Sequence, residues 1–188
     1  GPKGCGFLYV KEKTKIKPIL FGGGQQKGMR SGTENVPGIV GMAAAAKAAF
    51  AQMEERNRKI KELRDYLIER LEAEVPYCRL NGHRENRLPN NVNVSFQFIE
   101  GEAMLIMLDM KGICASSGSA CTSGSLDPSH VLLAIGLPHE IAHGSLRLTL
   151  SDETTKEDID YVVEKVKEIV ARLRDMSPLY EDFMKKNK

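Results

Sequence analysis

The C-terminal part of the chain carries the pattern that most constrains its fold. Seven apolar residues recur there at helical spacing, separated by charged or polar residues: Ile159, Val162, Val163, Val166, Ile169, Val170 and Leu173. Such a stripe predicts one long helix with a single buried face. Thr154-Thr155-Lys156-Glu157 has the form of a capping box, so the helix should begin there. A buried helix face needs an apolar surface to pack on, which predicts a mixed fold with the helix on a small sheet.

Segments upstream provide that sheet and further helices. Four have the composition of strands, and these are 7–10, 92–98, 113–115 and 145–150. Four more segments predict helices. The first helix begins at about Pro37, and the other three cover about 54–74, 101–109 and 128–135. The first two of these helices are consistent with one long, bent helix that leads into a second, smaller domain, and Pro76 ends it.

The totals exclude several classes of protein. With 27 basic and 25 acidic residues the net charge is +2, which gives no sign of nucleic-acid or membrane binding. Apolar stretches such as 103–108 are too short to span a bilayer, and no signal peptide is recognisable. Four widely spaced cysteines are typical of reduced thiols, so we expect a cytoplasmic protein. The chain opens on a glycine turn, Gly1–Gly6, and we interpret it as part of a larger fold.

The segment Ser116–Ser125 is the sharpest feature of the sequence. It contains five serines, two glycines and no large side chain, with Cys121 near its centre. A nucleophilic thiol needs access to solvent and substrate, which such a loop permits, although an incidental cysteine in a surface loop fits the same composition. Cys114, in an apolar segment, is expected to be a small buried residue. Zinc binding by Cys114, Cys121 and a histidine is disfavoured by their spacing.

Two further segments are candidates for binding anions. The glycine-rich loop from Gly22 to Asn35 precedes a helix and contains the hydroxyl of Thr33, which suits a phosphate, although it is not a Walker loop. Arg30 in this loop could equally form a structural ion pair. Alternation along 145–150 puts Arg147 on the face opposite Leu146 and Leu148. There it could hold a carboxylate or be an ordinary exposed strand residue.

Taken together, these motifs resemble a known family. Gly1-Pro2-Lys3-Gly4 before Phe7-Leu8-Tyr9-Val10, Gly22-Gly23-Gly24 leading to Arg30-Ser31-Gly32-Thr33, and Ser116-Ser117-Gly118-Ser119-Ala120-Cys121-Thr122-Ser123 look like the NifS/IscS branch of the cysteine desulfurases, class-V aminotransferase relatives. The ending Arg172–Leu179 is also similar, so the resemblance covers the whole chain. It implies the α/β fold-type I of pyridoxal-phosphate (PLP) enzymes. Residues 1–50 would then be the remainder of the large, PLP-binding domain, and residues 51–188 the small α+β C-terminal domain.

The resemblance also implies an activity and roles for three residues. The activity is PLP-dependent conversion of L-cysteine to L-alanine, with sulfur passed to acceptors for iron–sulfur cluster assembly or tRNA thiolation. Cys121 would become the persulfide, and no intrinsic metal is expected, although Cys121 could share an iron–sulfur cluster with a scaffold partner. Arg147 would hold the substrate carboxylate. Thr33 would contact the PLP phosphate of the partner subunit in a homodimer.

One departure from the family's pattern leaves alternatives open. The family's Schiff-base lysine lies in a Ser-x-His-Lys motif upstream of Gly-Pro-Lys-Gly, and this chain contains no such motif. The chain alone is therefore expected to be inactive. A selenocysteine lyase would use the same scaffold. A non-catalytic module that carries persulfide or binds a scaffold protein would need no lysine.

Overall fold

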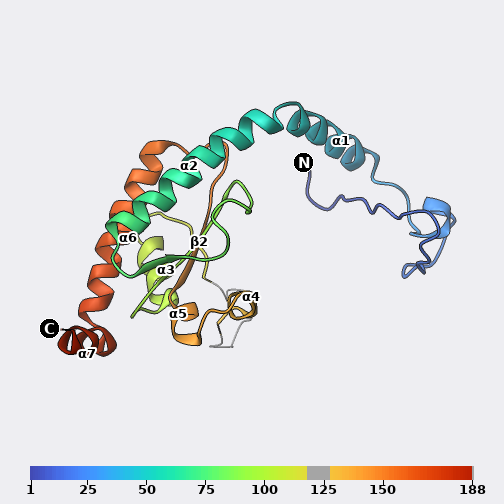
Figure 1. Ribbon diagram of the computed structural model, residues 1–188. Coiled ribbons are helices and arrows are strands. Elements are labelled where there is room, and N and C mark those ends of the chain that lie inside the picture. The colour runs from blue at the N-terminus through green and yellow to red at the C-terminus, as the bar shows by residue number, and fades with distance from the viewer. Residues whose placement is uncertain (118–127, 188) are drawn as a thin grey trace. The chain divides into compact units, whose positions relative to one another are not determined.

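The computed structural model describes residues 1–117 and 128–187, and it divides the chain into two compact units. The first unit is Gly1–Met53 and the second is Glu54–Lys188 (Figure 1). Helices and strands are mixed, as the sequence predicts, and the sheet lies in the second unit. Assignment of the units to a large and a small PLP-enzyme domain stays a prediction.

The second unit is built on a three-stranded antiparallel sheet. Its strands are β1 (Cys78–Leu80), β2 (Asn91–Phe96) and β3 (Ser145–Thr149), in the order β1-β2-β3. Its helices are α2 (Met53–Glu74), α3 (Gly101–Asp109), α4 (His130–Ala134), α5 (His139–His143), α6 (Lys156–Asp175) and α7 (Pro178–Lys186). The sequence did not predict β1, α5 or α7. Strand β1 has three residues and α5 has five, and the nine residues of α7 are of mixed composition.

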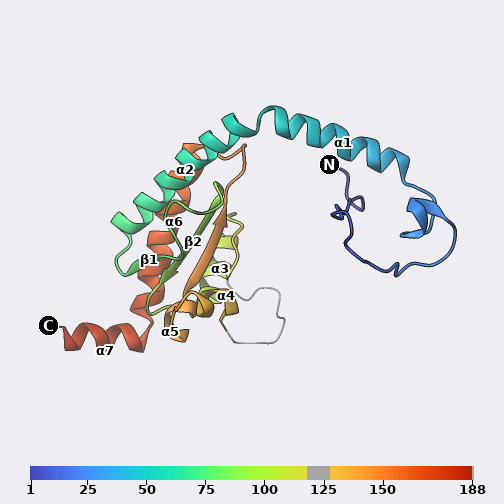
Figure 2. The ribbon, with the colours of Figure 1, turned by 45° about the vertical axis from the view of Figure 1, so that its right-hand side comes forward.

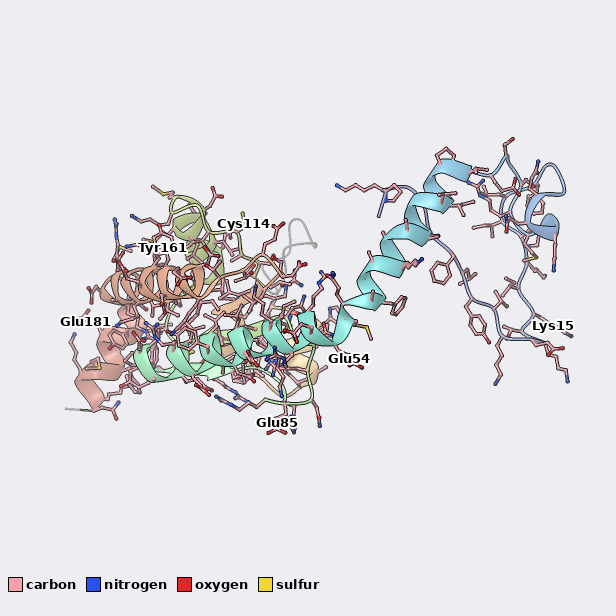
Figure 3. All side chains as sticks on the ribbon, turned by 90° about the horizontal axis from the view of Figure 1, so that it is seen from above. Lys15, Glu54, Glu85, Cys114, Tyr161 and Glu181 are labelled. Atoms are coloured by element: carbon pink, nitrogen blue, oxygen red, sulfur yellow. The ribbon has the colours of Figure 1, made fainter. Side chains whose placement is uncertain are left out.

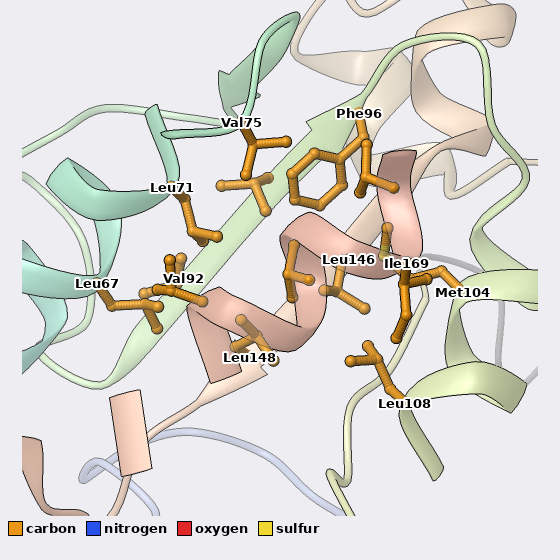
Figure 4. Close-up of a cluster of buried hydrophobic side chains, with 14 of the residues drawn as sticks. Leu67, Leu71, Val75, Val92, Phe96, Met104, Leu108, Leu146, Leu148 and Ile169 are labelled. Carbon is orange, nitrogen blue, oxygen red and sulfur yellow. The ribbon is translucent and has the colours of Figure 1, made fainter. Parts of the chain in front are cut away.

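One face of the sheet is apolar and carries the core. Alternate residues of β2 and β3 point to this face, and each is at most 5% exposed: Val92, Val94, Phe96, Leu146 and Leu148. Apolar residues of α2, α3 and α6 cover them, as Figure 4 shows for Leu67, Met104 and Ile169. The views in Figures 1 and 2 show α2 and α6 running alongside each other. A hydrogen bond of 2.6 Å from the Tyr66 hydroxyl to the Asp160 carboxylate joins these two helices.

Helix α6 begins with a capping box, one residue later than the sequence suggested. The Thr155 hydroxyl accepts from the Asp158 N–H at 3.1 Å, and the Asp158 carboxylate accepts from the Thr155 N–H at 2.9 Å. The predicted box began at Thr154, which instead accepts a hydrogen bond from the Ser151 N–H. The predicted buried face of α6 is confirmed, with Val162 and Leu173 partly buried at its edges.

The first unit has little regular structure. It contains the 3-10 turn η1 (Gln25–Gly28) and helix α1 (Val36–Ala51). The strand predicted at 7–10 is wrong, because no described residue pairs with it and a strand forms only with a partner. Among the described residues, no single helix is long and apolar enough to span a membrane, and only α1 and α2 taken together reach that length and composition.

Two further predictions about elements are corrected. Helices α1 and α2 are separate, because the helix breaks at Gln52, whose φ and ψ of −117° and 7° are not helical. Residues 113–115 do not form a strand; only Ser116 forms an isolated bridge, with Arg147. The segment was predicted from its apolar composition, which also suits a residue such as Ile113 that packs on the core without pairing.

Candidate functional site

The second face of the sheet is polar and carries a predicted site residue. The strand positions that alternate with the core residues hold Arg79, Asn91, Asn93, Ser95, Ser145, Arg147 and Thr149. Ser95 and Ser145 are buried, whereas Arg147 is exposed. No residue of the three strands is acidic. This face is therefore electropositive and rich in hydrogen-bond donors, which suits an anion.

Arg147 lies where the cysteine-containing segment meets the sheet. Alternation placed it opposite Leu146 and Leu148, and the structure confirms that orientation, since both leucines are buried and Arg147 is not. Its backbone N–H donates to the Ser116 carbonyl at 2.6 Å, and its carbonyl accepts from the Ser116 N–H at 3.1 Å. Ser116 stands five residues before Cys121 in the sequence. Cys121 itself lies outside the described residues, which resume at 128.

Gly101 allows close packing at the same point. An added Cβ at this position would lie 2.8 Å from the His143 carbonyl oxygen, 2.9 Å from that of Ser145 and 3.5 Å from the Ser117 side chain. A larger residue would have to push these backbones apart. The start of α3, the start of β3 and the entry to the cysteine segment thus meet around one glycine. Ser117 and Arg147 are held on this common base.

The glycine-rich loop of the first unit is closed by its own hydrogen bonds. The Ser31 hydroxyl donates to the Gly23 carbonyl at 2.9 Å, and the Gly32 N–H donates to the Gln25 side chain at 3.2 Å. Gly32 has a φ of 108°, which glycine adopts readily. Arg30 donates to the neighbouring Ser31 carbonyl and forms no ion pair with a described residue. The alternative prediction, that Arg30 forms a structural ion pair, therefore finds no acidic partner among the described residues.

The N-terminus of α1 is already capped. The Asn35 side chain accepts from the Gly38 N–H at 3.1 Å, Pro37 has no N–H, and the Val36 and Ile39 N–H groups donate to nearby carbonyls. The helix end therefore has no spare donor in its first turn for a phosphate. Thr33, in contrast, is exposed, and no described residue forms a hydrogen bond with its hydroxyl. An anion at this loop would depend on Thr33 rather than on the helix terminus.

The other three cysteines differ from one another. Burial raises the pKa of the Cys78 thiol to about 12, with a smaller contribution from Glu72, so this thiol stays protonated. Cys5 is half-buried. Cys114 was expected to be buried, and this is wrong: it is exposed. Cys114 lines a pocket of about 410 Å³ with Thr149, Tyr161 and others. Figure 3 labels Cys114 and Tyr161.

Sequence reasoning missed the polar neighbours of Arg147. Asn93 is directly opposite Arg147 in the register of β2 and β3. The Asn81 side chain donates a hydrogen bond of 2.7 Å to the Asn93 side chain. The signal was present in the alternation Asn91-Val92-Asn93-Val94-Ser95, which puts three polar residues on one face. Only the pairing of the strands could show which of them faces Arg147. Among the described residues, no group of three or more His, Cys, Asp or Glu side chains could hold a metal ion.

Comparison with known proteins identifies the family. The cysteine desulfurase IscS of Methanosarcina thermophila is 59% identical over 179 residues, which are 95% of this chain and 44% of that protein. That of Clostridium botulinum strain Hall is 56% identical over 187 residues, 98% of this chain and 47% of the relative. This chain thus spans less than half the length of these relatives.

Solved structures agree. A NifS-like protein superposes with a TM-score of 0.76 at 35% identity, covering 88% of this chain and 42% of its own. A NifS-like protein of Rickettsia africae gives a TM-score of 0.71, covering 83% and 40% of the two chains. The resemblance and the fold class inferred from the sequence are thereby confirmed. Residues 1–162 match the family described as aminotransferase class-V, and the chain belongs to that family.

Proposed function

We propose that this chain is the sulfur-accepting part of a cysteine desulfurase, which converts L-cysteine to L-alanine and passes the sulfur to an acceptor protein. The observation that carries the proposal is the pair of backbone hydrogen bonds between Ser116 and Arg147. They fix the start of the segment that contains the nucleophile candidate to the strand that contains the carboxylate-binding candidate. Identities of 56–59% to two cysteine desulfurases support it.

The family implies PLP as cofactor, and the residues of this chain fit it in one contact. The exposed Thr33 hydroxyl, without a described partner, can donate to a phosphate, which in the proposed homodimer belongs to the partner subunit's cofactor. None of the four histidines precedes a lysine, so a Ser-x-His-Lys motif has to come from polypeptide outside these residues. When bound, PLP supplies the electron sink that weakens the carbon–sulfur bond of cysteine.

The proposed roles of the remaining residues follow from their chemistry. The Arg147 guanidinium pairs with the α-carboxylate of cysteine and orients it, because its planar fork matches a carboxylate. The Cys121 thiolate attacks the substrate sulfur. The bond between that sulfur and the β-carbon breaks, the β-carbon gains a proton to give alanine, and Cys121 is left as a persulfide. The terminal sulfur then moves to the thiol of an acceptor.

The test is made in the full-length, PLP-loaded protein. Cys121→Ala should retain PLP and bind cysteine but release almost no sulfide, because the attacking thiol is absent. Mass spectrometry of the unmutated protein after cysteine treatment should find one extra sulfur on Cys121. The matched control is Cys114→Ala, which removes the exposed thiol seven residues upstream and should keep activity. Sulfur on Cys114, with Cys121→Ala still active, would overturn the proposal.

A further inference from the structure

Asn93 and Arg147 occupy neighbouring positions on the polar face of the sheet. They are directly opposite each other in the register of β2 and β3. The backbone bonds Phe96 N–H to Gly144 and Leu150 N–H to Asn90 set the phase of the ladder. In this phase, residues 93 and 147 form a pair without mutual backbone hydrogen bonds, and such pairs bring side chains closest, at a Cα separation of about 4.5 Å.

Asn81 fixes the orientation of the Asn93 amide. The Asn81 side chain is 4% exposed, and its Nδ2 donates to Asn93 Oδ1 at 2.7 Å and to Ser95 Oγ at 2.9 Å. The Asn81 backbone N–H also donates to the Asn93 carbonyl at 2.8 Å. Asn81 continues β1, on one side of β2, and β3 lies on the other side. The Asn93 oxygen therefore faces Asn81 on the β1 side, which leaves its NH₂ group free of Asn81, and Arg147 lies opposite Asn93 on the β3 side.

Two groups that only donate hydrogen bonds thus meet on this face. The Asn93 NH₂ and the Arg147 guanidinium cannot bond to each other, because neither offers an acceptor. No strand residue is acidic, and no described residue accepts a hydrogen bond from either group. Adjacent donors of this kind are complementary to a planar anion with two acceptor oxygens, which is the geometry of a carboxylate.

We propose that Asn93 is a second carboxylate-binding residue, which shares the α-carboxylate of the substrate with Arg147, and that Asn81 is its positioning residue. This inference rests on the proposed function, since it takes Arg147 as the primary contact. Arg147 supplies the charge, and Asn93 adds a neutral donor that fixes the rotation of the carboxylate. An amine substrate without a carboxylate would gain from neither.

The test measures binding of L-alanine to the full-length, PLP-loaded protein by calorimetry, because the product retains the α-carboxylate. Asn93→Asp keeps the shape of the side chain and still accepts from Asn81, but it replaces the donors with a charge that pairs with Arg147. L-alanine should bind about tenfold more weakly or worse, while the urea midpoint stays unchanged. Asn93→Ser, which adds no charge, should weaken binding by less.

The matched control is Asn91→Asp, the same change on the same face but opposite Thr149, and it should bind L-alanine as the parent does. Combining Asn93→Asp with Arg147→Ala should cost less than the product of the single effects, because both act on one carboxylate. Parent-like binding by Asn93→Asp and Asn93→Ser, with weak binding by Arg147→Ala, would refute the role of Asn93 alone. Parent-like binding by Arg147→Ala would refute the carboxylate site of the proposed function.

Discussion

The two units of the chain bury their apolar side chains to very different degrees. In residues 54–188, core side chains such as Phe96, Leu146 and Val163 are fully buried. In residues 1–53, Gly38 alone is buried, and the rings of Phe7 and Phe21 are each 84% exposed. The second unit therefore has the hydrophobic driving force to hold its own fold, and the first unit lacks it.

Both units contain apolar residues, so the difference lies in how far their side chains are buried. Exposed apolar side chains in such numbers are typical of a surface that contacts other protein. In the first unit they include Leu8, Tyr9, Ile19 and Val40. The relatives are more than twice as long as this chain, so they contain polypeptide that could cover such a surface. The proposed carboxylate site of the second unit, in contrast, stands on a sheet whose core residues all lie within residues 54–188.

Replacing one phenylalanine in each unit should give the largest difference between the units in the free energy of unfolding. Phe96→Ala removes a fully buried ring and should lower the free energy of unfolding by about 3–5 kcal/mol. Phe21→Ala removes a ring that is 84% exposed and should change it by less than about 0.5 kcal/mol. Urea unfolding of the 188-residue chain, followed by circular dichroism, measures both. Equal effects would mean that Phe21 has a core of its own.

The sequence predicted best where the pattern belongs to one element. Helix α3 has the predicted bounds, Gly101–Asp109, and α6 buries the predicted stripe, because periodicity reports burial directly. The strand at 7–10 was wrong, because composition shows that a segment suits a sheet but not that a partner exists. Cys114 was wrong for a related reason: its segment leaves β3 after the single bridge at Ser116.

The candidate site, too, was predicted correctly only where the pattern lies within one element. The orientation of Arg147 followed from alternation along one strand. Its neighbours depend on how β1, β2 and β3 pair, which brings Asn81 and Asn93 to Arg147 from 66 and 54 positions away in the sequence. No local pattern encodes such a register. The self-capping of α1 by Asn35 was likewise hidden, since a helix start after a glycine-rich loop suggests an anion site until its N–H groups are accounted for.

Burial in the second unit should also give two of its thiols different rates of alkylation. The Cys78 pKa is raised to about 12 by burial, and Cys114 is exposed. At pH 8, iodoacetamide should alkylate Cys78 at least about tenfold more slowly than Cys114, because only the thiolate reacts. Peptide mass spectrometry over time measures both rates in one sample. Since the folded pKa lies above the unfolded value of 9.0, the stability linked to Cys78 is present below pH 9 and is lost as the pH rises toward 12. Similar rates for the two thiols would show that the edge formed by β1 opens readily.

Substitutions at the helix caps should have the smallest effects, and they test the difference between the two units most selectively. Thr155 caps α6, which packs on the core, whereas Asn35 caps α1, whose 16 residues include one buried glycine. Thr155→Ala should lower the free energy of unfolding by about 1 kcal/mol, because it leaves an N–H without its acceptor at the start of a helix that the fold needs. Thr155→Ser retains the hydroxyl and should restore most of this loss.

Asn35→Ala removes a cap of the same kind, and the Gly38 N–H loses its acceptor. The helix content measured by circular dichroism should fall slightly, and amides of α1 should exchange faster with deuterium. The urea midpoint of the second unit should not move, because α1 contributes no side chain to its core. If Asn35→Ala instead costs as much as Thr155→Ala, then α1 and α6 unfold together. The two units would then be one cooperative structure, and the exposed apolar side chains of residues 1–53 would need another explanation.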